Sequence, residues 1–164
     1  MNKINVSIWI QLTCVTSSGH WCKQGKRHKC PTGFYGKNEG LSDSRCNGLC
    51  LPGFYCKEAS TSNKQFPCGS TSVYCPIGSS SPKLTDRGRY SYNSSIVMSP
   101  STTWTTMDEK LKNATMSWQR ECEEGFYCVD GMKLQCPKGT FNNDTGMSHI
   151  SDCKSCQKGT LTEQ

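Results

Sequence analysis

Apolar positions along this chain are sparse and follow no sustained helical period. Leu, Ile, Val and Phe number 24 in 164 residues, and six of them lie within the first 15. Elsewhere they are mostly single, or form short aromatic pairs directly after a glycine, as in Phe34-Tyr35, Phe54-Tyr55 and Phe126-Tyr127. Such brief runs between Gly, Pro and Ser predict short two-stranded ribbons and turns. We expect at most a single helical turn, near Met107–Lys112.

The glycines belong to a repeated unit, Cys-x-x-Gly, usually followed by an aromatic or hydroxyl residue. Its six copies begin at Cys30, Cys50, Cys75, Cys122, Cys136 and Cys156. The glycine permits a positive φ in the turn, and a proline after the cysteine in three copies fixes φ at its entry. The aromatic side chain can shield a disulfide from water. Repetition at this density predicts a tandem array of small modules.

Composition explains why the array needs cysteine. So few aliphatic residues cannot offset the conformational entropy lost on folding. The chain has 13 cysteines, and small extracellular domains with weak cores use disulfides in their place. We therefore expect a small disulfide-rich, irregular β fold, with tandem cysteine-rich modules in an elongated array.

The spacing of the copies suggests two disulfides. Cys30–Cys46 and Cys136–Cys153 close the same kind of loop in corresponding copies. Closing a loop of roughly 16 residues contributes about 3 kcal/mol if the gain is entropic. Spacing alone does not fix the remaining pairs. Eight further cysteines are expected to form disulfides, with their pairing left open: Cys22, Cys50, Cys56, Cys68, Cys75, Cys122, Cys128 and Cys156.

Residues 1–19 resemble a secretory signal peptide. Lys3 precedes the most apolar window, Ile4 to Val15, which is too short and too polar to span a bilayer. Cleavage after Ser18 or Gly19 would remove Cys14 and leave 12 cysteines, an even number. The alternative is that residues 1–19 form a poor strand after an imperfect N-terminus.

The remaining chain divides by cysteine content. We expect cysteine-rich modules over residues 20–89, a cysteine-free β or loop insert over 90–121, and another cysteine-rich module over 122–164. The last copy of the unit, at Cys156, has no closing cysteine after it. This suggests a piece of a longer ectodomain.

The formal charge of +6 is modest, and much of it lies in a short run of four cations, Lys23, Lys26, Arg27 and Lys29. One interpretation is contact with an acidic glycan or a membrane headgroup. The other is a solvated linker between two cysteines.

Zinc is the main rival use of the cysteines. The sequence has one Cys-x-x-Cys, Cys153–Cys156, with His149 nearby, whereas a structural zinc site usually needs a second close pair. Cys156 and His149 could also be considered as a nucleophile and its base, but no other catalytic motif is present. We therefore expect no enzymatic activity, no metal site and no cofactor.

Three sequons suit a secreted chain: Asn93-Ser-Ser, Asn113-Ala-Thr and Asn143-Asp-Thr. Asn93 and Asn113 lie in the cysteine-free segment, where glycans could shield an otherwise soft loop.

The segment Cys136-Pro-Lys-Gly-Thr-Phe followed by Cys153-Lys-Ser-Cys156-Gln-Lys-Gly-Thr resembles the cysteine-rich module of ephrin-receptor ectodomains. It is similar also to tumour necrosis factor receptor and growth-factor-receptor cysteine-rich repeats, and the resemblance covers about residues 28–160. In those modules the first cysteine bonds the one that closes the loop, which agrees with Cys136–Cys153.

The resemblance implies an extracellular, non-enzymatic spacer or protein-binding module of a receptor-like or cell-surface ectodomain. Alternatives are a secreted soluble binding protein and an intracellular zinc-binding module. The expected partner is an unidentified protein or glycan, with no nucleic acid. We expect membrane attachment only through other parts of a longer chain.

Overall fold

The structure, a computed structural model, describes residues 14–93 and 115–157. These residues form seven two-stranded antiparallel ribbons and one short 3-10 helix, η1 (Ile150–Asp152). The strands pair as β1 (His20–Lys23) with β2 (Lys26–Lys29), β3 (Phe34–Tyr35) with β4 (Gly48–Leu49), β5 (Phe54–Tyr55) with β6 (Phe66–Pro67), β7 (Val73–Tyr74) with β8 (Lys83–Leu84), β9 (Arg89–Tyr92) with β10 (Trp118–Glu121), β11 (Phe126–Val129) with β12 (Met132–Gln135), and β13 (Thr140–Phe141) with β14 (Lys154–Ser155). The expected fold class, a small disulfide-rich irregular β protein, is confirmed.

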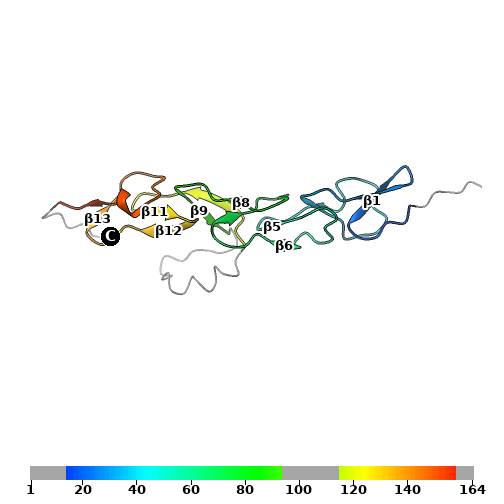
Figure 1. The fold of residues 1–164 in the computed structure, drawn as a ribbon, viewed down its shortest axis with the longest axis horizontal. Helices are drawn as coiled ribbons and strands as arrows, with labels where there is room; N and C mark the ends of the chain where they lie inside the picture. Colours follow the sequence, from blue (N-terminus) through cyan, green and yellow to red (C-terminus); the bar gives the residue numbers. More distant parts are fainter. Residues whose placement is uncertain (1–13, 94–114, 158–164) are drawn as a thin grey trace, which may run out of the picture.

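The ribbons follow one another along a rod, in the order of the sequence (Figure 1). The ribbon β1–β2 lies near one end and β13 near the other, so the two ends of the described chain are far apart. Each ribbon contacts mainly its neighbours, as in other linear repeat proteins. This arrangement is the elongated array that the repeat predicts.

A tight turn precedes the first strand of every ribbon in the described chain. The first strand residue donates its N–H to the carbonyl three residues earlier, at 3.0–3.2 Å; Phe54 bonds Leu51 in this way and Phe126 bonds Glu123. In the Cys-x-x-Gly units the glycine sits just before the strand with a positive φ, +84° at Gly53 and +80° at Gly125. The repeated glycine is thus explained by turn geometry.

A second repeated hydrogen bond closes each ribbon. The residue after the second strand, here called the junction residue, donates its N–H to the carbonyl of the residue before the first strand, at 2.8–3.0 Å. The junction residue also begins the next unit, so it belongs to two ribbons at once. The junction residues are Cys30, Cys50, Cys68, Thr85, Cys122, Cys136 and Cys156.

Further backbone bonds connect consecutive units. The turn glycines Gly33, Gly53 and Gly125 donate to the carbonyls of Cys56, Cys75 and Asn142, each at 2.8 Å and each in the following unit. Because these bonds use only the main chain, they tolerate wide variation in side chains. They set the stacking of the ribbons independently of any apolar core.

Cysteine supplies most of the interior. Seven of the nine buried apolar residues in the described ranges are cysteines, and the other two are Tyr90 and Met116. Leu49, Ile77, Leu84 and Ile150 are exposed instead. Disulfide sulfur therefore occupies the positions that aliphatic side chains fill in ordinary domains.

The expected boundary after residue 19 is not a boundary in the structure. Cys14 forms a disulfide with Cys22, Thr16 is buried, and Gly19 donates its N–H to Gly36 O at 2.6 Å. Cleavage after Ser18 or Gly19 would therefore remove the disulfide partner of Cys22, and the signal peptide stays a prediction. Residues 1–13 lie outside the described residues.

The cysteine-free segment is anchored at both ends. Tyr92 pairs with Trp118 and Arg89 with Glu121, so the segment that was expected as an insert over 90–121 begins and ends inside one ribbon, β9–β10. The helical turn expected near Met107–Lys112 lies outside the described residues.

Candidate binding surface and crosslink sites

Six disulfides connect twelve of the thirteen cysteines: Cys14–Cys22, Cys30–Cys46, Cys50–Cys56, Cys68–Cys75, Cys122–Cys128 and Cys136–Cys153. Their Cα atoms are 5.8–6.1 Å apart, within the usual range. The pairs Cys30–Cys46 and Cys136–Cys153 are the two that the repeat suggested. Cys156 forms no disulfide with any described cysteine.

Five of the seven junction residues carry these disulfides, in two arrangements. Cys50, Cys68 and Cys122 bond cysteines six or seven residues later: Cys56 and Cys75 directly follow the next ribbon's first strand, and Cys128 lies near the end of it. Cys30 and Cys136 bond cysteines 16 and 17 residues later, in the loop of that ribbon. In these units Gly36 and Asn142 take the place of the nearer cysteine. A Cβ on Gly36 would lie 2.6 Å from Cys30 Sγ, so the glycine there leaves room for the sulfur.

One junction has hydroxyls where the others have sulfur. Thr85 is a junction residue, and Ser91 lies six residues later, where Cys56 and Cys128 lie in their units. Thr85 Oγ1 donates to Thr71 O at 3.1 Å, and Ser91 Oγ donates to the same carbonyl. The two hydroxyls are thus tied together through one acceptor in place of a covalent bond.

A charged cluster joins this unit to the next one. Tyr90 OH donates to Glu123 Oε1 at 2.9 Å, and Lys133 Nζ lies 3.1 Å from Glu123 Oε2. Lys133 Nζ also lies 4.5 Å from the centre of the Phe126 ring. Within the described chain Oε2 has no hydrogen-bond donor of good geometry, so the ion pair with Lys133 is its main compensation.

The cluster shifts the acidity of its members. Burial raises the pKa of Tyr90 to about 12, with help from the hydrogen bond to Glu123. Burial opposes ionisation of Glu123, but Lys133 and Tyr90 outweigh it and hold the pKa of Glu123 below its usual value. Glu123 is therefore ionised at neutral pH and acts as a structural anion between two units.

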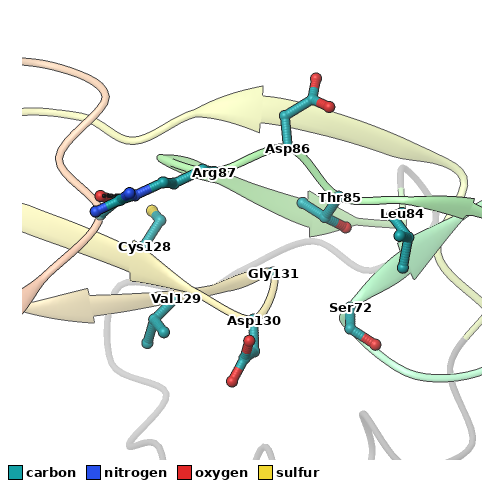
Figure 2. A pocket seen from close by; sticks show the side chains of 10 residues that line it. Ser72, Leu84, Thr85, Asp86, Arg87, Cys128, Val129, Asp130 and Gly131 are labelled. Carbon is teal, nitrogen blue, oxygen red and sulfur yellow. Dashed lines mark hydrogen bonds between the residues drawn. The ribbon is translucent and has the colours of Figure 1, made fainter.

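A groove of about 320 Å³ lies beside the same joint. Figure 2 shows Ser72, Leu84 and Thr85 at one side and the turn Val129–Gly131 at the other. Two of the three charged residues that line it already bind protein groups: Asp86 accepts from Gln119 Nε2 at 2.5 Å, and Arg87 donates to Ser148 Oγ at 2.8 Å. The groove is therefore a gap between neighbouring ribbons, and its lining residues include no paired acid and base that could act in catalysis.

Two of the three residues considered for zinc or catalysis, Cys153 and His149, have other partners in the structure. Cys153 is bonded to Cys136, which removes it from a zinc site with Cys156. His149 caps η1, with Nδ1 accepting from Ser151 N at 3.2 Å. In residues 14–93 and 115–157, no group of three or more His, Cys, Asp or Glu side chains is placed to hold a metal ion.

Two of the three sequon asparagines lie within the described residues. Asn143 is exposed in the loop after β13. Asn93 is half-buried, and its Nδ2 donates to Thr115 O at 2.8 Å. A glycan on Asn143 could extend directly into solvent. Glycosylation leaves a single N–H on the Asn93 side chain, and that N–H would have to keep the hydrogen bond to Thr115 O. Asn113 lies outside the described residues.

Sequence reasoning missed the Thr85 unit because it searched for cysteine. Thr85-Asp-Arg-Gly88-Arg-Tyr90 keeps the glycine and tyrosine spacing of Cys122-Glu-Glu-Gly125-Phe-Tyr127, and that spacing was the usable signal. Conversely, Cys75-Pro-Ile-Gly78 keeps the turn of the unit, since Gly78 has φ +72° and Ser79 donates its N–H to Pro76 O at 3.2 Å, but no strand follows it directly and β8 begins only at Lys83.

Comparisons with known proteins identify no relative: no family description, no curated protein and no solved structure matches this chain. In the described ranges, no helix has the length and apolar character needed to cross a membrane. The many disulfides are of the kind found in extracellular proteins.

Proposed function

We propose that this chain is a non-enzymatic, extracellular rod that acts as a spacer or protein-binding surface within a receptor-like or cell-surface ectodomain. The observation that carries the proposal is the linear stack of ribbons held at its junctions by disulfides (Figure 1). Such a stack keeps its two ends apart and offers a long lateral surface. Both are the properties that a spacer or a docking module needs.

Chemistry supports an extracellular location. Twelve cysteines in disulfides need an oxidising compartment to form and persist. The exposed sequon at Asn143 suits the same route. An intracellular zinc module would need these thiols reduced, and Cys153 would have to leave Cys136.

The polar groups also favour a structural role over catalysis. Glu123, the carboxylate with the clearest burial and partners, is neutralised by Lys133 and bonded to Tyr90. It holds two units together and is not poised to exchange a proton at neutral pH.

The test is to produce the chain through an oxidising secretory route and count its thiols. We expect secretion, one reactive thiol per chain, at Cys156, and the six pairs given above in peptide mapping. Small-angle scattering should give an elongated particle. Ten or more reactive thiols with bound metal, or a compact sphere, would overturn the proposal.

A further inference from the structure

The ribbon β1–β2 is the most basic surface near one end of the rod. Every residue of β2 (Lys26–Lys29) is exposed, and Lys23 on the facing strand is exposed too. We call residues 20–29 the basic ribbon. Its tight turn at Gln24–Gly25 has φ of +50° and +75°, the conformation of a two-residue hairpin. The cations are therefore held on a short, defined surface.

The register divides the basic ribbon into two faces. Trp21 pairs with His28 and Lys23 with Lys26, and cross-strand partners share a face. Arg27 and Lys29 lie on the opposite face, across from Cys22 and His20. One face thus presents two lysines beside an aromatic pair. The rings of Trp21 and His28 are stacked with centroids 4.8 Å apart.

The charge on that face is uncompensated. Lys29, on the other face, binds Glu58 Oε2 at 2.9 Å, but Lys23 and Lys26 have no ion pair within the described residues. Like charges directly opposite each other on a ribbon are destabilising. A bound anion would relieve this repulsion.

The distribution of charge along the rod points the same way. Residues 14–68 contain eight Lys and Arg against three Asp and Glu, whereas residues 115–157 contain four against six. An acidic partner is therefore attracted to the end of the rod that carries the basic ribbon.

We propose that the Trp21 face of the basic ribbon binds an acidic polysaccharide, with Lys23 and Lys26 holding sulfate or carboxylate groups and the Trp21–His28 stack facing a sugar ring. Lysine is a suitable point charge for such groups, and aromatic faces present a flat apolar surface to the ring. Trp21 is the one large apolar side chain of the basic ribbon, and it is half-buried and stacked on His28, so the ribbon offers a ring face for contact and no fully exposed apolar side chain for insertion into a lipid bilayer. This inference rests on the extracellular location proposed above, where nucleic acid is not the expected polyanion.

The experiment measures binding of the full oxidised chain to an immobilised heparin oligosaccharide. The key variant is K23Q/K26Q. Its matched control on the same ribbon is R27Q/K29Q, which removes the same charge from the opposite face. A remote control is K37Q/K83Q, two exposed lysines on other units. Melting temperature and thiol count of each variant establish that it is folded.

We expect K23Q/K26Q to weaken binding by about tenfold or more, because these charges contact the ligand. Each control should weaken it by about threefold or less: Arg27 and Lys29 lie on the opposite face, with Lys29 already paired to Glu58, and Lys37 and Lys83 are distant and screened by salt. W21L should also weaken binding while leaving its salt dependence unchanged. Equal losses in all three charge variants would overturn the assignment of the face.

Two further arms separate the ligand classes. Vesicles containing phosphatidylserine should bind more weakly than heparin, and fully desulfated, uncharged oligosaccharide should not bind. Preference for vesicles, or no heparin binding by the wild type, would overturn this inference. Either result would leave the proposed rod standing, since that is tested by thiol count and scattering.

Discussion

Two neighbouring units have the same pattern of backbone hydrogen bonds but differ in the side chains that crosslink them. The unit that begins at Cys122 has a disulfide to Cys128, and the unit that begins at Thr85 has a hydroxyl at each corresponding position, Thr85 and Ser91. Each junction residue donates its N–H, at 2.9 Å, to the carbonyl that comes just before the first strand of the preceding ribbon, Ser72 O for Thr85 and Gly88 O for Cys122. Both units also place a glycine and an aromatic residue at the same offsets.

The comparison indicates that the repeated backbone hydrogen bonds within and between units, here called the backbone ladder, determine the shape of the rod. The disulfide adds a crosslink to it. At the Thr85 unit, two hydrogen bonds to Thr71 O suffice to hold the same geometry. A hydrogen bond contributes about 1 kcal/mol net, whereas a disulfide closing a loop of six residues contributes about 2 kcal/mol in the entropic treatment. The Thr85 unit should therefore be the weaker of the two.

The largest effect is expected from breaking the turn of the Thr85 unit. Gly88 has φ +73°, and a Cβ there would overlap Gly146 O from a later unit. G88A should lower the free energy of unfolding by about 3 kcal/mol, from backbone strain together with overpacking. The matched control is G139A, where φ is +81° but no atom of residues 14–93 or 115–157 lies within 4 Å of the added Cβ. It should cost about 1 kcal/mol in urea unfolding, and equal losses would contradict the stacking described here.

Removing the crosslink tests the other unit. C122S/C128S should lower the free energy of unfolding by about 2 kcal/mol, since the unfolded chain regains the entropy of a six-residue loop. The variant should keep its elongated shape in scattering, because the ladder remains. A collapsed or unfolded double variant would show that the disulfide, and not the backbone, defines the junction.

Adding a crosslink should make the two units alike. T85C/S91C places two cysteines at the offset of Cys122 and Cys128, so we expect an additional disulfide and a gain of about 1.5 kcal/mol. Peptide mapping detects the bond, and thermal unfolding with and without reductant measures the gain. Two unreacted thiols at positions 85 and 91 under oxidising conditions would show that the units are not equivalent.

The smallest change in the free energy of unfolding is expected at the charged cluster that joins the two units, which contains Tyr90, Glu123 and Lys133. Because folding lowers the pKa of Glu123, its contribution to stability is present above the ordinary value of 4.5 and is lost as pH falls through the lowered folded pKa. E123Q should cost about 1 kcal/mol at pH 7, because it leaves Lys133 without its anion. The difference between E123Q and the wild type should shrink below pH 4.5. An E123Q penalty independent of pH would mean that packing, not charge, matters at this position.

The general plan of the fold could be predicted from the sequence because it depends on residue types that are specific to turns. Glycine after Cys-x-x marks a positive φ wherever it recurs, and scarce aliphatic residues exclude an ordinary core. The long-loop pairs Cys30–Cys46 and Cys136–Cys153 follow from equivalent spacing. They are the pairs present in the structure.

Other features depend on contacts between units, which no local pattern specifies. The role of Cys14 depends on Cys22, and cysteine parity suggested the opposite. The Thr85–Ser91 pair is recognisable only once the junction residues are aligned in space. The polar cluster of Tyr90, Glu123 and Lys133 draws on two ribbons, and its residues look like ordinary surface groups in the sequence.

The most direct test of the account compares the oxidised chain with the same chain after mild reduction and alkylation, by thermal unfolding and small-angle scattering. If buried sulfur crosslinks replace an apolar interior, reduction will abolish the cooperative melt and raise the radius of gyration toward that of an unfolded chain of this length. A reduced chain with the same melting temperature and the same dimensions would contradict the account.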